Sequence, residues 1–184
     1  MLAGAEQTGG NLVRSAAAGD RDAFASLVRL NQSMVYSLAW NSLRDQALAE
    51  ELAQDVFLEL HKALPGLDSP AHVTNWLRRV AMHRCIDHVR RERSRPRVAL
   101  DDIPEPVAES TGTTDLLMLQ KVRSVIGTLP ARARAVVVLR YQEDMEPTEI
   151  AGVLGLPVNT VKSQLHRALA MLRAKLQRSA RIAK

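Results

Sequence analysis

Apolar side chains recur at the spacing of an α-helix along most of this sequence. A first stripe follows Asp20, whose carboxylate suits a helix N-cap, and a second helical pattern is closed by Pro65. A third helix is predicted from about Val73 to Arg93. The short β-branched run at residues 135–139 lies between arginines at helical spacing, so it does not predict a strand. The sequence therefore predicts an all-α fold class.

A segment without helical period divides the chain. Residues 96–115 hold three prolines, a glycine and clustered serines and threonines, a composition typical of a flexible linker. Two small helical domains are predicted on either side of it, at residues 20–95 and 116–180. Residues 1–19 are small and polar, and they predict a loose N-terminal tail that reaches its first helix near Asn11.

Charge is distributed unevenly along the chain, although the net charge is only +5. Residues 78–97 include eight basic and two acidic side chains, and residues 116–184 include twelve basic and four acidic ones. Residues 98–115 between them have five acidic side chains and no basic one. Two separated basic blocks indicate two contacts with a polyanion. Aromatic residues make up 3% of the chain, too few for base stacking to be the main means of binding.

The chain contains one cysteine, Cys85, which excludes an internal disulfide and a cysteine-based zinc site. We expect Cys85 to pack as a small apolar residue, with redox sensing as the alternative. No apolar run is long enough to span a bilayer, and the N-terminus lacks the pattern of a signal peptide. The sequence predicts a cytoplasmic protein without direct membrane insertion, so that a partner would make any link to a membrane.

Known catalytic motifs are absent from the sequence. It has no glycine-rich phosphate loop, no G-x-S-x-G and no His-Glu metal signature. The five histidines are scattered, and His83 and His88 lie five positions apart, which does not place both on one helical face. We therefore expect no enzyme activity, no metal site and no cofactor.

The stretch "TEIAGVLGLPVNTVKSQLH" has the offsets of a helix-turn-helix. Ala151 lets two helices approach, Gly155 tolerates the turn, and Val161 docks the second helix on the first. Val161 begins an apolar stripe that continues to Leu176.

The face of the second helix opposite that stripe carries short hydrogen-bonding side chains and basic side chains, and no acidic side chain. Such side chains read base edges and contact phosphates in a major groove. The alternative is an ordinary solvated face of a bundle helix. The predicted duplex-binding residues are Asn159, Thr160, Lys162, Ser163, His166 and Arg167.

The helix in "LAEELAQDVFLELHKAL" has an apolar face and an opposite, mixed face. An exposed leucine among acidic and amide groups is typical of a protein-docking surface. A single exposed leucine is also common on proteins without such a function. The mixed face consists of Glu51, Gln54, Asp55 and Leu58.

The third helix changes its apolar side along its length, from Trp76 and Leu77 to Met82 and Ile86. This pattern predicts a helix buried between several neighbours. Its arginines suit a nucleic-acid backbone, although arginines that lie along a core helix and extend their charge to solvent are the alternative.

Three segments together resemble a known family. They contain "LAQDVF", "WLRRVA" and "NTVKSQLHRA", in the order found in bacterial extracytoplasmic-function (ECF, group IV) RNA polymerase sigma factors of the sigma-70 family. The resemblance identifies residues 20–95 with sigma region 2 and residues 116–180 with sigma region 4.

The resemblance implies a role for each part of the chain. The mixed face would dock on the clamp helices of the largest subunit of core RNA polymerase, and the polymerase flap would be a further contact. Residues 155–176 would read the minus-35 promoter duplex. An anti-sigma factor is implied as a further partner. The residues implied in melting the promoter and binding its minus-10 strand are Asp68, Thr74, Asn75, Trp76, Arg79, His83 and Arg84.

The chain departs from the family pattern at several of these positions. His83 replaces a frequent asparagine near the melted bases, and Asn159 and Gln164 stand where glycine and arginine are frequent. Before the helix-turn-helix, Pro147 occupies a first-turn position.

Two alternatives remain from the residues alone. One is a stand-alone helix-turn-helix transcriptional regulator, and the other is a helical adaptor whose basic blocks serve solubility. The segment "LAQDVF" with its mixed face favours a polymerase subunit over both, and it predicts promoter recognition and transcription initiation.

Overall fold

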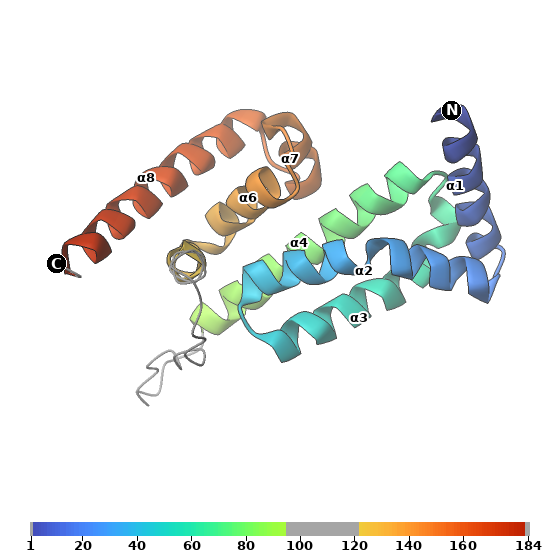
Figure 1. Cartoon of the computed structure of the whole chain (residues 1–184), viewed down its shortest axis with the longest axis horizontal. Coiled ribbons are helices and arrows are strands. Elements are labelled where there is room, and N and C mark those ends of the chain that lie inside the picture. The colour runs from blue at the N-terminus through green and yellow to red at the C-terminus, as the bar shows by residue number, and fades with distance from the viewer. Residues whose placement is uncertain (1, 95–121, 183–184) are drawn as a thin grey trace.

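The computed structural model describes the backbone of residues 2–94 and 122–182, and the side chains of residues 9–93 and 122–178. Within these ranges the chain forms helices and no strand (Figure 1), which confirms the all-α prediction. The predicted linker at residues 96–115 lies outside the described residues. Residues 122–127 are helical, and the other elements are α1 (Leu2–Ala17), α2 (Arg21–Leu43), α3 (Gln46–Ala63), the 3-10 turn η1 (Leu64–Gly66), α4 (Pro70–Ser94), α6 (Ala131–Gln142), α7 (Pro147–Leu154) and α8 (Val158–Ile182).

The helices α1 to α4 form the N-terminal lobe, and their boundaries follow from local chemistry. The side chain of Asp20 accepts hydrogen bonds from the amides of Asp22 and Ala23, which confirms its predicted role as the N-cap of α2. Asp45 caps α3 in the same way, through the amide of Leu48 at 2.9 Å. These caps fix where α2 and α3 begin, and the apolar faces of the helices then pack on one another.

The prediction of a loose tail at residues 1–19 is wrong, because α1 extends from Leu2 to Ala17. Val13 and Ala16 of α1 are buried in the core of the N-terminal lobe. Gly9 explains how the helix comes so close to α4: a Cβ atom at Gly9 would lie 2.7 Å from Cγ of Pro70. A glycine that suggests a tail in the sequence therefore allows close packing of two helices.

The helix-turn-helix forms as predicted in the C-terminal lobe, which comprises residues 122–182. Gly155 ends α7 with a left-handed backbone at φ 63°, and its amide donates to the carbonyl of Ala151. Pro147 stands in the first turn of α7, and Val161 of α8 is fully buried against the preceding helices. The turn thereby sets the direction in which α8 leaves the lobe (Figure 1).

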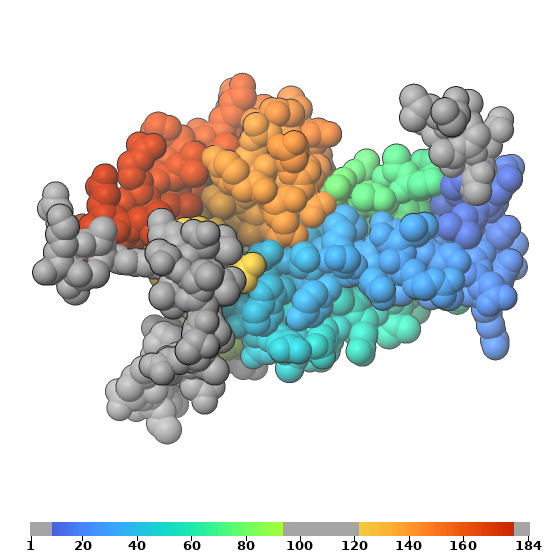
Figure 2. Space-filling model, in the orientation of Figure 1, coloured from blue at the N-terminus to red at the C-terminus, as the bar shows by residue number. Residues whose placement is uncertain are grey.

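The two lobes are in direct contact. Helix α6 contacts both α2 and α4, and α7 contacts α4. Figure 2 shows the C-terminal lobe, coloured yellow through orange to red, against α2 in blue and α4 in green. Leu38, Met82 and Ile86 of the N-terminal lobe are buried in the same cluster as Val136 and Leu139 of the C-terminal lobe. The lobes therefore share part of one hydrophobic core.

Candidate nucleic-acid and protein interfaces

The predicted duplex-binding residues lie on the first three turns of α8. Val161 and Ala168 are fully buried and hold the helix against the C-terminal lobe. The hydroxyl of Ser163 donates to the carbonyl of Asn159 at 2.8 Å, so its oxygen remains free to accept. Helix α8 contains no acidic residue, and its exposed face is therefore cationic. Of the six predicted residues, Thr160 is half-buried, and Asn159, Lys162, Ser163, His166 and Arg167 are exposed.

The mixed face of α3 points outward, as its periodicity predicts. Leu52, Val56 and Leu60 are buried on the opposite side of the helix. Leu58 is 64% exposed, so a large apolar side chain faces solvent on this side of the helix. Glu51 and Gln54 are exposed beside it, and Asp55 is half-buried. The four predicted polymerase-binding residues therefore share one surface of the N-terminal lobe.

Arg84 joins this surface to α4. Its guanidinium donates to Asp55 Oδ2 at 3.0 Å and also pairs with Glu59. The hydrogen bond that Arg84 donates to the Glu59 carboxylate raises the pKa of Arg84. Arg84 is one of the residues predicted to bind the minus-10 strand, and these contacts place its side chain against α3.

Three of the predicted minus-10 residues, Asn75, Trp76 and Arg79, line a cleft of about 330 Å³. The opposite wall of the cleft belongs to the C-terminal lobe and includes Met145 and Glu149.

The remaining minus-10 candidates make contacts within the N-terminal lobe. Thr74 donates to Asn31 Oδ1 at 3.3 Å, and His83 contacts the carbonyl of Arg79 at 2.8 Å. His72 lies 3.1 Å from Asp68 Oδ1, and this hydrogen bond lowers the pKa of Asp68. The structure thus gathers only part of the predicted minus-10 set at the cleft.

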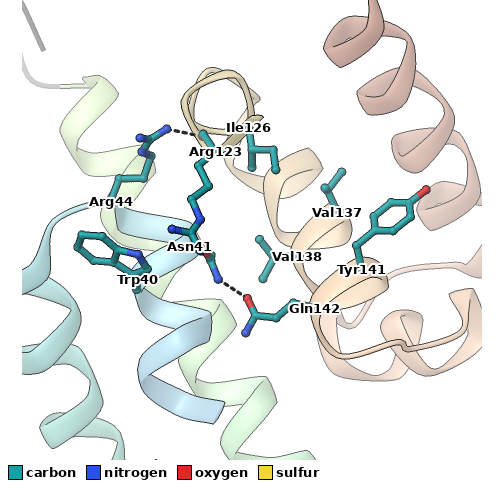
Figure 3. A pocket seen from close by; sticks show the side chains of 9 residues that line it. All are labelled: Trp40, Asn41, Arg44, Arg123, Ile126, Val137, Val138, Tyr141 and Gln142. Atoms are coloured by element: carbon teal, nitrogen blue, oxygen red, sulfur yellow. Dashed lines mark hydrogen bonds between the residues drawn. The ribbon is translucent and has the colours of Figure 1, made fainter. Parts of the chain in front are cut away.

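Polar contacts across the seam between the lobes were not predicted from the sequence. Nε and Nη2 of Arg78 approach Glu143 Oε2 at 2.9 and 2.8 Å. Asn41 donates to Gln142 Oε1 at 2.5 Å (Figure 3). The partners are separated by 65 and 101 positions, so no local pattern in the sequence could pair them.

Arginines also lie along the same seam between the lobes. Arg134 is buried and donates to the carbonyls of Ser42 and Gly127. Burial, together with the charges of Arg93 and Arg44, lowers the pKa of Arg134 to about 10. Arg44 donates to the carbonyl of Arg123 at the edge of an apolar groove of about 330 Å³ (Figure 3). Among the described residues, backbone oxygens rather than carboxylates accept from these arginines.

Cys85 lies inside α4 with 1% of its surface exposed, which confirms that it packs as a small apolar residue. Burial raises the pKa of its thiol to about 12. A buried protonated thiol is a poor nucleophile, so the contacts of Cys85 do not favour redox sensing. In the part of the chain that is described, no helix combines the length and hydropathy needed to cross a bilayer.

Known protein families match both lobes of the chain. Residues 27–95 match the family described as sigma-70 region 2, and residues 119–172 match sigma-70 region 4. The chain is 30% identical to the ECF RNA polymerase sigma factor SigW of Bacillus subtilis, over 86% of this chain and 91% of SigW. It is 31% identical to the ECF RNA polymerase sigma factor SigM of Mycobacterium tuberculosis, over 91% of this chain and 84% of SigM.

Solved structures show the same arrangement of helices. CnrH, solved in complex with the cytosolic domain of CnrY, superposes with a TM-score of 0.68 at 27% identity, over 92% of this chain and 97% of CnrH. RpoE of Bartonella quintana, solved with the anti-sigma factor NepR, has the same fold, with a TM-score of 0.66 at 19% identity, over 84% of this chain and 96% of RpoE. The chain therefore belongs to the ECF sigma factors of the sigma-70 family, which direct RNA polymerase to promoters.

Proposed function

We propose that this sigma factor recognises promoters through two separate DNA contacts, one on α8 and one on α4. The observation that supports it best is the exposed face of α8, which has no acid and is anchored by buried Val161 and Ala168. Lys162 and Arg167 would contact the minus-35 duplex, where cations and short hydrogen-bonding groups suit the major groove. Such a helix would set the register of the protein on the promoter.

The second contact would be made by the minus-10 residues around α4. Asn75 and Arg79 offer hydrogen bonds and charge, and Trp76 offers an aromatic ring for an unstacked base. Promoter melting needs such groups, because bases leave the duplex only when other partners replace their stacking. The remaining members of this proposed set are Asp68, Thr74, His83 and Arg84.

Docking on core RNA polymerase would use the mixed face of α3. Leu58 would be the apolar anchor, and Glu51, Gln54 and Asp55 would pair with polar groups around it. The clamp helices of the largest subunit and the flap are the proposed partner elements. A stand-alone regulator has no need of this surface, and the family membership of the chain does not favour that alternative.

The protein would act without chemistry of its own, as an initiation factor in the cytoplasm, and polymerase would form the RNA. It would have no need of a cofactor. We also propose an anti-sigma factor as a partner, since CnrH, at 27% identity, was solved with a protein bound to it. That partner would compete with polymerase for the N-terminal lobe.

Multi-round transcription tests this function. Core polymerase and genomic DNA are incubated with and without the protein, and the 5′ ends of the transcripts are sequenced. We expect discrete start sites that appear only with the protein and share two sequence elements upstream. Start sites that are the same with and without the protein would exclude the proposed function.

A further inference from the structure

The groove of about 330 Å³ between the lobes has mainly apolar walls (Figure 3). Val137 and Val138 of α6 line it with buried side chains, and Ile126 packs against the same cluster as Val137. Trp40 of α2 lines it with a half-buried ring. Sites for small molecules are clefts of about 300–1,000 Å³ with apolar walls and a few polar groups. This groove therefore has the size and the walls of a small-molecule site.

Two arginines give one side of this groove a positive charge. In Figure 3 the side chains of Arg44 and Arg123 lie on the same side of the groove as Trp40. Both arginines are exposed at the rim. Partial burial, together with the charge of Arg123, lowers the pKa of Arg44, so the two guanidiniums are near enough to repel each other. An anion between them would relieve that repulsion.

The guanidinium of Arg44 is held at the groove by two unusual features. The backbone of Arg44 has a left-handed φ of 64° at the C-cap of α2, a conformation that glycine adopts more readily than arginine. Gly127 leaves room for the side chain, because a Cβ atom there would lie 2.7 Å from Cδ and 2.9 Å from Nη1 of Arg44. The position of this cation is therefore built into both lobes.

No acidic side chain among the described residues pairs with Arg44 or Arg123. Arg44 donates to the backbone carbonyl of Arg123, a neutral acceptor that does not offset the charge. Arg134 lies nearby in the seam, where burial and the charges of Arg93 and Arg44 lower its pKa. A cationic rim beside apolar walls is complementary to a molecule that carries a negative group on an apolar body.

We propose that this groove binds a small, free amphipathic carboxylate, whose carboxylate group pairs with Arg44 and Arg123 and whose apolar body lies against the buried valines of α6. A carboxylate matches the planar guanidinium, and it costs less to bring beside apolar walls than a doubly charged phosphate does. The site is independent of the proposed promoter and polymerase contacts, because none of the residues that line the groove belongs to those surfaces.

Isothermal titration calorimetry of the full chain tests the site with decanoate, kept below the concentration at which it forms micelles. We expect saturable binding at a single site. Decanol and decylammonium keep the chain length but lose or reverse the charge, and they should bind at least about tenfold more weakly. Octanoate lacks two methylenes and should also bind about tenfold more weakly than decanoate. Absence of decanoate binding, or equal affinities for decanoate and decylammonium, would overturn the proposal.

Substitutions at the rim test the role of the two arginines. Arg44→Met and Arg123→Met should each raise the dissociation constant of decanoate by about tenfold, and Arg44→Lys should retain most of the affinity. Arg29→Met removes an exposed arginine of α2 that does not line the groove, so its affinity should match that of the wild type. Circular dichroism shows that each variant is folded, and the two rim arginines stand on separate helices, so one variant can replace the other. Wild-type affinity in the folded rim variants would overturn the proposal.

A brominated ligand locates the site. The chain has two tryptophans, of which Trp40 lines the groove and Trp76 lines the cleft beside α4. The bromine of 2-bromodecanoate quenches tryptophan fluorescence on contact. We expect saturable quenching in Trp76→Phe, where Trp40 remains, and none in Trp40→Phe. Quenching of Trp76 alone would place the ligand in the other cleft and contradict the proposed site.

Discussion

The guanidinium of Arg134 on α6 donates to the backbone carbonyl of Ser42 on α2. A buried cation of one lobe thus supplies the hydrogen-bond donor for a carbonyl at the end of a helix in the other lobe. The same side chain also reaches the carbonyl of Gly127. Carbonyls near the end of a helix lack an intrahelical partner and need one from elsewhere when they are buried. Arg134 therefore ties the stability of α2 to the position of the C-terminal lobe.

Arg134→Met should lower the free energy of unfolding. The substitution keeps most of the apolar stem and leaves the carbonyls of Ser42 and Gly127 without a donor, a loss of about 1–3 kcal/mol. Urea denaturation followed by circular dichroism measures it. Arg132→Met on the exposed side of α6 is the matched control and should change stability by less than about 0.5 kcal/mol. Equal denaturation midpoints for the two variants would contradict the assigned contact.

Cys85 should not react with maleimide in the folded protein at pH 8, because its thiol is buried and its pKa is raised to about 12. Labelling should begin only as urea unfolds the chain. Ser33→Cys adds an exposed thiol on α2 and should be labelled at once, which checks the reagent. Rapid labelling of Cys85 in native buffer would show that α4 opens without unfolding.

The same thiol makes stability depend on pH. Because folding raises this pKa, the protonated thiol of Cys85 stabilises the folded state relative to the unfolded one. This stabilisation is complete below the unfolded pKa of about 8.5 and is lost as pH rises toward 12. Between pH 8 and 10 the wild-type protein should therefore lose more stability than Cys85→Ala does. Urea denaturation measures the free energy of unfolding of the two proteins at each pH. The same pH dependence for both would rule out a contribution from Cys85.

Lys162→Ala and Arg167→Ala should each weaken binding to a minus-35 duplex. The expected loss is about 1–3 kcal/mol for a good base contact, and loss of a phosphate contact should reduce the salt dependence by about one ion. Fluorescence anisotropy at several salt concentrations separates the two cases. Arg173→Ala lies further along α8, is also exposed, and should have a smaller effect. A larger effect from Arg173→Ala would move the interface toward the C-terminal half of the helix.

Leu58→Ser should weaken the complex with core polymerase by about fivefold or more, since a central apolar anchor contributes at least about 1 kcal/mol. Leu30→Ser on α2 is a close match, because Leu30 is 72% exposed and Leu58 is 64% exposed. Affinity for fluorescently labelled core polymerase compares them. If both variants bind as well as the wild type, the α3 surface is not the docking site.

Local rules explain which parts of this molecule could be predicted from the sequence. The cap at Asp20, the turn at Gly155 and the buried stripe from Val161 depend on residues a few positions apart. Helical rotation alone places Leu58 opposite Val56 and Leu60, so the mixed face was visible in the sequence. These features need no knowledge of the tertiary structure.

The missed features depend on distant partners. Glycines near the N-terminus predicted a tail, but Gly9 is instead the point where α1 approaches Pro70. Arg78 and Arg84 are alike in the sequence, yet one pairs with Glu143 across the seam and the other with Asp55 and Glu59 on α3. Helical periodicity shows which side a residue faces and does not show which neighbour lies there.

Run-off transcription by core polymerase from one mapped promoter combines the polymerase contact and both DNA contacts in a single readout. The template is compared with one whose minus-35 element is scrambled, and a tailed template shows that the core enzyme is active. We predict transcripts from the mapped promoter only when the protein is present, and a loss of those transcripts with the scrambled element. Equal yields from the two promoter templates, or no transcript while the tailed template is transcribed, would contradict a sigma factor that recognises promoters through α8.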